Sequence, residues 1–335
     1  MNWEKGFTAT YYAYIIDAKT WRETELLQIT AGSISRSDTG LRDSADITCI
    51  NYNDQERYIR LYLDVQQNGA SAHVPIFTGM TSAPSRDIDG VLETNSVECY
   101  SVLKAAEDVL LQRGYYVPAE IDSSLIIKDL LSVTPAPIEV VGEAPALQTS
   151  VIAEDGENHL SMVDKILTAI NWRMRILGDG TIQILPPAEE TVRTFDVLNT
   201  DVIEPTLKIT RDWYQCPNVL RAVSGDMYAV ARDDSDDSPL STVNRGREVW
   251  AEETNVSLNT GESIAEYAIR RLKELQLIET TASYTRRYDP DVLVSDWVRL
   301  NYPRQGLQGI YEITSQKITL GYGCTTEEEV KYVGK

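Results

Sequence analysis

A short alternating pattern occurs twice in this chain, once near each end. The segments Tyr58 to Tyr62 and Trp297 to Asn301 each begin with an aromatic residue and alternate around a central Arg. A glycine within strand-like sequence follows each segment, Gly79 in the first copy and Gly309 in the second. A period of two is typical of a β-strand that buries one face. The recurrence therefore indicates two related β-modules, with the glycines where matching strands bend, and a function that lies in their surfaces.

The composition is that of an ordinary globular protein. The chain has 335 residues, which suggests two or three domains, and 42% of them are hydrophobic. Lys and Arg number 31 against 51 Asp and Glu, a formal net charge of -20. Binding to a phosphate backbone requires cationic patches, so we predict no specific binding of nucleic acid. A negative surface would still let DNA pass nearby without adhering.

The cysteines and the N-terminus exclude several other classes. Cys49, Cys99, Cys216 and Cys324 lie far apart, without the spacing of a zinc site or of a disulfide framework. We expect reduced, mostly packed thiols. The first residues do not form a signal peptide, and no apolar run is long enough to span a membrane. We predict synthesis in the cytoplasm and no membrane association.

Residues 1–100 are predicted to form a small antiparallel β-barrel. β-branched and aromatic residues alternate there, and Asp-Thr-Gly, Asn-Gly and Asp-Gly sequences supply turns between the strands. The predicted strands are 10–15, 47–50, 58–65, 74–78 and 96–100.

Residues 101–190 are predicted to form an inserted α/β domain. The pattern changes to helical spacing from Ser101 to a terminating Gly114, and Asp122 is placed to cap a helix over 123–131. A third helix is predicted over 158–172. A β-hairpin turning at Gly178-Asp179-Gly180 follows it.

Residues 191–325 are predicted to form a second β-barrel domain. It includes a helix over 262–277, which Ser263 and Glu266 begin with capping-box spacing. Strands over 281–287, 297–301 and 310–320 close the domain, and 326–335 is expected to be a C-terminal tail. The predicted fold class is α+β, mainly β, with two related antiparallel barrels, an inserted α/β domain and a helix before the closing strands.

No residue stands out as catalytic, cofactor-binding or metal-binding. His73 and His159 lie outside any triad or metal-ligand spacing, and turn glycines explain Gly178-Asp179-Gly180 and Gly321-Tyr322-Gly323 because no phosphate-loop pattern surrounds them. The acidic run 233–237 departs from the register of a calcium-binding loop and is predicted to be a solvated loop. We therefore predict that the protein is not an enzyme and needs no cofactor.

Abundant carboxylates and aromatic residues leave two other classes open. A carboxylate pair could make the chain an enzyme that degrades cell walls. The 18 Tyr and 6 Trp could line a glycan-binding surface. Their excess over 3 Phe favours protein interfaces, where an amphipathic ring packs its body and bonds its polar tip.

In the order of its elements the chain resembles the baseplate hub proteins of phage tails. This family includes hubs of contractile-tailed phages, the late control protein D group, and hubs of defective prophages and tail-like particles. The segments that carry the resemblance are 97–103, 161–171 with the hairpin at 178–180, 212–219, 295–300 and 309–315. Together they cover most of the chain.

The resemblance implies a homotrimer located in the baseplate of a virion or phage tail-like particle. Each subunit would contribute two similar barrels, so that three subunits form a ring matching a six-fold tail tube on one face and a three-fold spike or tip on the other. The implied partners are the tube protein, the spike protein and other baseplate proteins. DNA would pass through an acidic lumen. We also expect a larger hairpin loop in the first barrel, around Gln66 to Ala72, because more residues separate Leu61 from Gly79 than Leu300 from Gly309.

Overall fold

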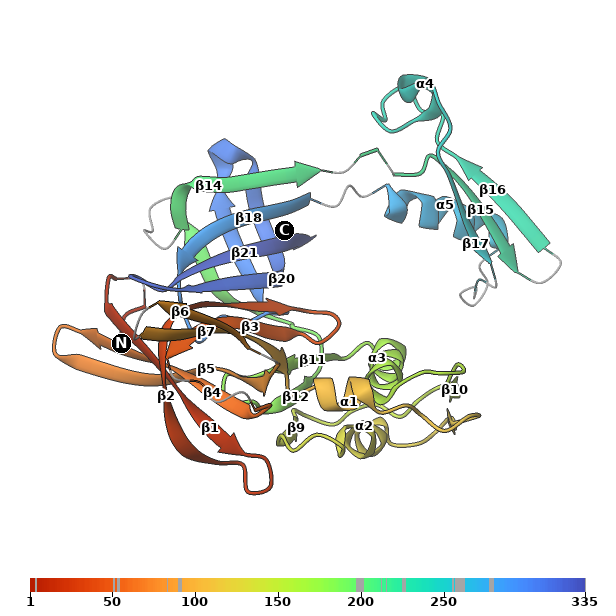
Figure 1. Cartoon of the computed structure of the whole chain (residues 1–335). Helices are drawn as coiled ribbons and strands as arrows, with labels where there is room; N and C mark the ends of the chain where they lie inside the picture. The colour runs from red at the N-terminus through yellow and green to blue at the C-terminus, as the bar shows by residue number, and fades with distance from the viewer. Residues whose placement is uncertain are drawn as a thin grey trace. The chain divides into compact units, whose positions relative to one another are not determined.

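The chain forms two compact units, both rich in β-strands (Figure 1). The computed structural model describes residues 1–3, 5–50, 52, 55–82, 84–89, 92–196, 202–211, 213–214, 216–224, 227–254, 256, 263–276 and 280–334. Unit 1 comprises Met1–Leu207 and Ser283–Lys335, and unit 2 comprises Lys208–Ala282. The mainly β prediction is confirmed.

One large sheet contains most of the strands of unit 1. Its strands are β1 (Thr8–Asp17), β2 (Arg22–Ser37), β3 (Asp43–Ile50), β4 (Tyr58–Gln67), β5 (Ala70–Thr81), β6 (Ser85–Asp89), β7 (Leu92–Ser101), β13 (Thr191–Asp196), β14 (Val202–Arg211), β18 (Thr280–Arg287), β19 (Trp297–Tyr302), β20 (Leu307–Leu320) and β21 (Thr325–Gly334).

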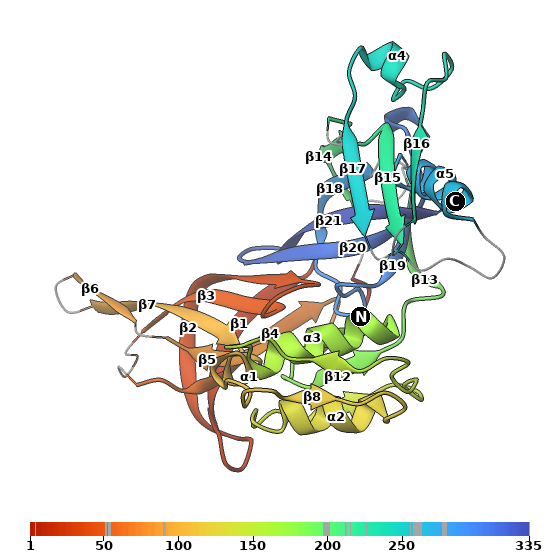
Figure 2. The ribbon, with the colours of Figure 1, turned by 90° about the vertical axis from the view of Figure 1, so that its right-hand side faces the viewer.

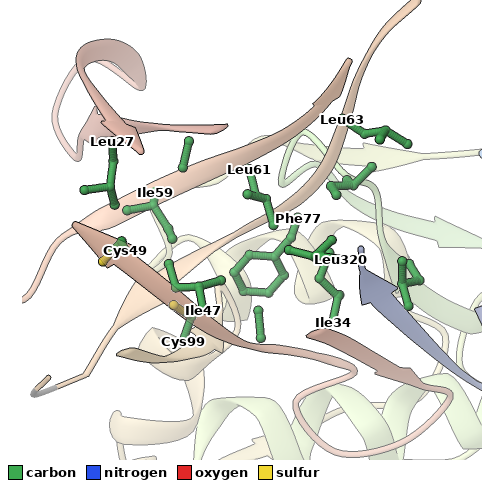
Figure 3. Packing of buried hydrophobic residues seen from close by; sticks show 14 of the residues in the cluster. Leu27, Ile34, Ile47, Cys49, Ile59, Leu61, Leu63, Phe77, Cys99 and Leu320 are labelled. Atoms are coloured by element: carbon green, nitrogen blue, oxygen red, sulfur yellow. The ribbon is translucent and has the colours of Figure 1, made fainter. Parts of the chain in front are cut away.

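The first six principal strands pair in a closed ring. The antiparallel pairs run from β1 to β4, β5, β7, β3 and β2, and β2 pairs back to β1. Alternate residues of these strands point into one hydrophobic core, as period-two alternation requires. Figure 3 shows the Phe77 ring among aliphatic side chains that include Ile47 and Leu61.

The strand order of this ring occurs a second time in the sheet. The first module reads β2-β3-β7-β5-β4-β1 and the second reads β14-β18-β21-β20-β19-β13. When the six strands of each module are ranked by their order along the chain, both paths read second, third, sixth, fifth, fourth and first. The modules differ at their first strand, because β1 is antiparallel to β4 whereas β13 is parallel to β19. The repeated segments, Tyr58 to Tyr62 and Trp297 to Asn301, lie on β4 and β19. The pattern that suggested duplication is therefore found on corresponding strands.

Gly79 and Gly309 lie opposite the repeated segments on the paired strand, where the backbones of neighbouring strands approach closely. Gly79 is opposite Ile59, and Gly309 is opposite Leu300. A Cβ atom at Gly79 would lie 2.3 Å from the Tyr100 carbonyl oxygen, and one at Gly309 would lie 2.6 Å from a neighbouring carbonyl oxygen. Close packing of adjacent strands requires glycine at both positions.

The larger loop expected around Gln66 to Ala72 is wrong. β4 and β5 are joined by the two-residue turn Asn68-Gly69, in which both residues have positive φ, as tight hairpins require. The additional residues extend the paired strands instead. The β19–β20 connection is the longer one, and it contains a short 3₁₀ helix (Pro303–Gln305).

Residues between the two modules form an α/β layer with its own core of buried residues from Val102 to Ile184. It contains α1 (Lys104–Asp108), β8 (Tyr116–Val117), α2 (Ser123–Leu131), β9 (Ile138–Val140), β10 (Val151–Ile152), α3 (His159–Ile170), β11 (Arg173–Ile176) and β12 (Ile182–Leu185). Figures 1 and 2 both show this layer beside β4 and β5.

The helix predictions in this layer are confirmed at two of three places. Asp122 caps α2 and Asn158 caps α3 through their side chains. The helix predicted from Ser101 to Gly114 is too long, because α1 ends at Asp108 and Val109 is extended. Leu110 then forms a β-bridge with Asn158, which draws the chain out of the helix.

Unit 2 is a small three-stranded sheet packed against one helix. Its elements are β15 (Val219–Ser224), β16 (Met227–Arg232), α4 (Thr242–Arg245), β17 (Trp250–Thr254) and α5 (Ile264–Leu275). β15 is antiparallel to β16 and parallel to β17. The helix predicted over 262–277 is α5, and residues 262 and 277 lie outside the described residues, as do 212 and 215 of the segment 212–219.

The capping box of Ser263 and Glu266 is present as predicted. The buried face of α5 packs on β15 and β16 within unit 2. The helix therefore belongs to a compact unit of its own, whereas the prediction included it in the second barrel. None of the described helices is long and apolar enough to cross a membrane.

The expected C-terminal tail is wrong. Residues up to Gly334 form β21, which pairs with β20. Thr326, Glu328 and Val330 alternate with exposed residues and are buried, so the segment has the pattern of a half-buried strand despite its acidic residues. The remaining domain boundaries stay predictions.

Gly79→Ala should destabilise the protein by roughly 1–3 kcal/mol, the usual cost of overpacking, because the added methyl group meets a backbone oxygen and the Phe77 ring. Gly321→Ala is the matched control, since a Cβ there meets nothing within 4 Å and the backbone φ is not positive. Urea unfolding of both variants tests this. Equal stability of the two variants would contradict the close approach at Gly79.

Candidate functional site

The two modules are joined by the pairing of β2 with β20. Gly32 to Ser37 of β2 are antiparallel to Ser315 to Leu320 of β20. Ile318 and Leu320 belong to the hydrophobic core of the first module, although they come from the second (Figure 3 shows Leu320). We call this β2–β20 pairing the seam. It turns the two modules of one chain into one continuous sheet.

A row of buried polar side chains crosses the seam. Asp43 is opposite Arg36, Arg36 is opposite Gln316, and Gln316 is opposite Glu328, on the adjacent strands β3, β2, β20 and β21. The exposed fractions of these residues are 4%, 6%, 2% and 0% in the order Asp43, Arg36, Gln316 and Glu328. Charged residues are rarely buried unless they are paired, so each needs a partner.

The second-module end of the row is an ion pair. Arg286 Nη2 lies 2.6 Å from Glu328 Oε1, and Gln316 Nε2 donates to the same oxygen at 2.7 Å. The Arg286 guanidinium also lies 5.9 Å from the centre of the Phe195 ring. Burial raises the pKa of neighbouring Tyr284 well above its ordinary value, and the charge of Glu328 adds to this. Arg286 and Glu328 are 1% and 0% exposed, so the ion pair is shielded from water.

The first-module end of the row is less completely paired. Arg36 Nη2 donates to the Ile76 carbonyl oxygen at 2.5 Å. Burial raises the pKa of Asp43 to about 8, and the charge of Arg36 offsets part of that rise. Burial thus favours the protonated form of Asp43.

Three arginines fasten the α/β layer to both modules. Arg42 Nε donates to the Met174 carbonyl oxygen at 3.1 Å, and its Nη2 lies 2.5 Å from Asp164 Oδ1. Arg173 and Arg175 of β11 reach the second module, at Glu312 within β20 and at Asp296 just before β19. Their ion pairs are Arg173–Glu312 at 2.6 Å and Arg175–Asp296 at 2.8 Å. A cavity of about 270 Å³ lies among these groups, lined in part by Arg42, Arg173, Asp164 and Glu312.

The glycine-rich turn packs against the first module. Thr78 Oγ1 donates to the Gly178 carbonyl oxygen at 2.8 Å, and Arg60 Nη2 donates to the Asp179 carbonyl oxygen at 2.9 Å. A Cβ at Gly178 would lie 1.9 Å from the Pro75 carbonyl oxygen. The segment is a hairpin turn, as predicted, and its glycines permit this contact.

The two histidines have separate local partners. His73 Nδ1 lies 2.6 Å from the Tyr12 hydroxyl and 2.7 Å from Asp64 Oδ1 on the surface of the first module. His159 Nδ1 lies 2.8 Å from the Leu130 carbonyl oxygen, at the start of α3. The structure does not bring the two residues together.

The acidic run 233–237 in unit 2 is held by hydrogen bonds within the unit. Asp233 accepts from Ser238 Oγ at 2.6 Å and from Gln276 Nε2 at 2.9 Å, and Asp234 accepts from Arg232 Nε at 2.8 Å. Within the described part of the chain, no group of His, Cys, Asp and Glu side chains is arranged to hold a metal ion.

Aromatic side chains gather on the outer surface of the first module. The rings of Tyr62 and His73 stack at 4.2 Å, Tyr12 stacks on Tyr62 at 5.8 Å, and Tyr14 meets both tyrosines edge-on. Burial, followed by the charge of Asp64, raises the pKa of Tyr12 to about 12. Such partly exposed Tyr clusters are typical of protein interfaces.

Sequence reasoning missed the polar row, although a signal for it exists. In β3, Asp43 has the same parity as the buried residues Ala45 and Ile47, and in β21 Glu328 has the parity of Val330. A charged residue at an inward position of an alternating strand indicates a buried partner. Which strand supplies that partner depends on pairing between distant parts of the chain.

No family model matches the sequence, and no curated protein matches it significantly. Solved structures do match. The 43 kDa tail protein of prophage MuSo2 from Shewanella oneidensis has a TM-score of 0.66 at 14% identity, covering 96% of this chain and 97% of its own. A tail protein from Neisseria meningitidis MC58 has a TM-score of 0.64 at 14% identity, covering 98% and 97%.

A third similar structure comes from another assembly. It is an E. coli component of the type VI secretion system that exhibits structural similarity to the T4 bacteriophage tail proteins gp27 and gp5. Its TM-score is 0.50 at 9% identity, and the match covers 92% of this chain and 74% of that one. The chain thus has the fold of phage tail proteins over nearly its full length, which confirms the resemblance at the level of the fold.

Glu328→Gln should lower the free energy of unfolding by about 3–5 kcal/mol, because it leaves the Arg286 charge buried without a countercharge. Glu274→Gln is the matched control, since Glu274 pairs with Arg270 on the surface of α5 with both side chains 42% exposed. That change should cost about 0.5 kcal/mol or less. Similar urea midpoints for the two variants would show that the buried Arg286–Glu328 pair contributes no more to stability than the exposed pair.

Asp43→Asn should flatten part of the pH dependence of stability. The folded-state pKa of Asp43 is raised, so the folded protein keeps a proton that the unfolded chain loses above about pH 4. Wild-type stability should therefore fall as pH rises toward 8, whereas Asn does not titrate. The variant should gain stability relative to wild type between pH 5 and pH 9, measured by urea unfolding.

Asp17→Asn is the control for this measurement. Hydrogen bonds from Thr20 lower the pKa of Asp17, so its contribution is lost only when the pH falls below the ordinary range of a carboxyl group. Its difference from wild type should stay constant between pH 5 and pH 9. A constant difference for Asp43→Asn as well would refute the raised pKa.

Proposed function

We propose that this chain is the structural baseplate hub of a phage or phage tail-like particle. The observation that carries the proposal is the strand order that occurs twice within one chain. A single subunit then presents two β-modules of the same construction, which we interpret as two small barrels. Three subunits would present six modules and could match a six-fold tube on one face.

In this proposal the subunits assemble through symmetry-related complementary surfaces, and no reaction is catalysed. A homotrimer with two modules per subunit has six similar docking positions around a three-fold axis. The α/β layer and unit 2 occur once per subunit, so they repeat three times and suit a three-fold spike or tip. The proposed partners are the tube protein, the spike protein and other baseplate proteins.

The comparisons support this proposal through the fold. The MuSo2 and Neisseria structures are tail proteins, and the E. coli structure is a component of a type VI secretion system. The net charge of -20 is compatible with a conduit through which DNA slides without adhering. The protein would be non-catalytic and would reside in the baseplate after synthesis in the bacterial cytoplasm.

The purified chain should form trimers, because two modules per subunit need three copies to complete six positions. Light scattering coupled to size exclusion should give three times the chain mass of 37.6 kDa, and negative-stain images should show rings. A stable monomer at all concentrations, with no ring in particles, would contradict the hub proposal.

A peptidoglycan digestion assay distinguishes the hub from a wall-degrading enzyme. We expect no release of fragments by the purified chain. Robust activity that disappears when one Asp or Glu is replaced would overturn the non-catalytic proposal in favour of a carboxylate-pair lysin.

A further inference from the structure

Among the described residues, three strands of the large sheet pair on one side only, and these are β6, β13 and β14. β6 pairs with β7 on one side, and β14 neighbours β18 on one side. Among the described residues, no further strand pairs with the outer edge of either. An open edge presents unpaired backbone donors and acceptors and is a template for another strand. Ile88 of β6 is 66% exposed, so this edge also carries an unprotected apolar side chain.

Because the strand order is repeated, β6 and β14 each have a counterpart elsewhere in the same chain, and the pairing of these counterparts is known. The end of β5 and then β6 lie one after the other along β7, just as the single strand β20 lies along β21. β6 is therefore the counterpart of the second half of β20. β14 is the counterpart of β2, since both are second along the chain in their module and both neighbour the third strand.

Inside one chain, the second half of β20 pairs with β2 to form the seam. The counterparts of these two strands, β6 and β14, lie at separate places in the sheet order. We propose that β14 of one subunit pairs antiparallel with β6 of a neighbouring copy of this chain, repeating the seam between subunits. This inference rests on the proposed hub function and names the surface that closes its ring.

The contact is heterologous, because the two edges that meet are different strands. Heterologous contacts close into rings when the rotation per subunit permits it. With seam and seam-like contacts alternating around the ring, neighbouring modules meet through one kind of strand pairing at every position. Backbone hydrogen bonds would then join all modules into a continuous sheet in which the open edges of β6 and β14 are covered.

Disulfide trapping tests the contact on the full-length chain. Antiparallel partners have Cα atoms about 4.5–5.5 Å apart, which is within reach of a disulfide. Ser85→Cys or Ile88→Cys on β6 is combined with a cysteine at each position from Leu207 to Thr210 on β14. Cys216→Ser removes the partly exposed native thiol from every variant. We expect covalent dimers and trimers on non-reducing gels.

The pairing direction gives a sharper readout. In an antiparallel pair, moving from Ser85 to Ile88 should shift the favoured β14 partner by three residues toward the start of β14. Variants with Ser85→Cys combined with Arg221→Cys are the control. Arg221 is exposed but lies on the central strand of the unit 2 sheet, which cannot accept another strand.

Each outcome decides between the proposals. Cross-links in the reversed order, absent from the Arg221→Cys control, support the β6–β14 contact. Trimers in light scattering without cross-links from any tested pair, or with equal cross-links in the control, overturn this contact and leave the hub proposal standing. A chain that stays monomeric overturns both.

Discussion

The pairing of β2 with β20 is the interaction on which unit 1 depends, since it places part of a C-terminal strand within the core of the N-terminal module. The polar row across it is costly, because buried charges lose their hydration and apolar residues would often be more stable. We interpret the row as a device that fixes register. A slip by two residues would replace Gln316 opposite Arg36 with Ile318 in one direction and with Thr314 in the other. A slip by one would turn every inward residue outward.

The α/β layer depends on that seam because it is fastened on both sides of it. Arg42 follows β2 in the first module, whereas Arg173 and Arg175 reach Glu312 and Asp296 in the second. Arg42 donates to groups of the layer, whereas Arg173 and Arg175 of the layer donate to carboxylates of the second module. A shift of one module relative to the other would break the contacts of the layer with one of them, so seam and layer hold each other in place.

Local signals made the capped helices of this architecture predictable. The caps at Asp122, Asn158 and Ser263 act within three residues, so sequence alone identifies the helices that they begin. Pairing between distant segments was not predictable in this way. The acidic residues of β21 concealed a strand whose partner is β20, and only a neighbouring strand decides whether residues such as Glu328 are buried. The polar row was missed for the same reason, because its partners come from both ends of the chain.

The two modules share one strand order but differ in the connections between their strands, because order and connections are subject to different physical demands. A β-module fills its core only if its strands keep their order, whereas connections at the surface tolerate insertions. Unit 2 accordingly lies between β14 and β18, and the corresponding β2–β3 connection is short. Under the proposed assembly, the modules would be alike in their strands and different in their insertions. Three subunits could then present a six-fold pattern through their sheets and a three-fold pattern through their insertions, which is the mismatch that a hub must bridge.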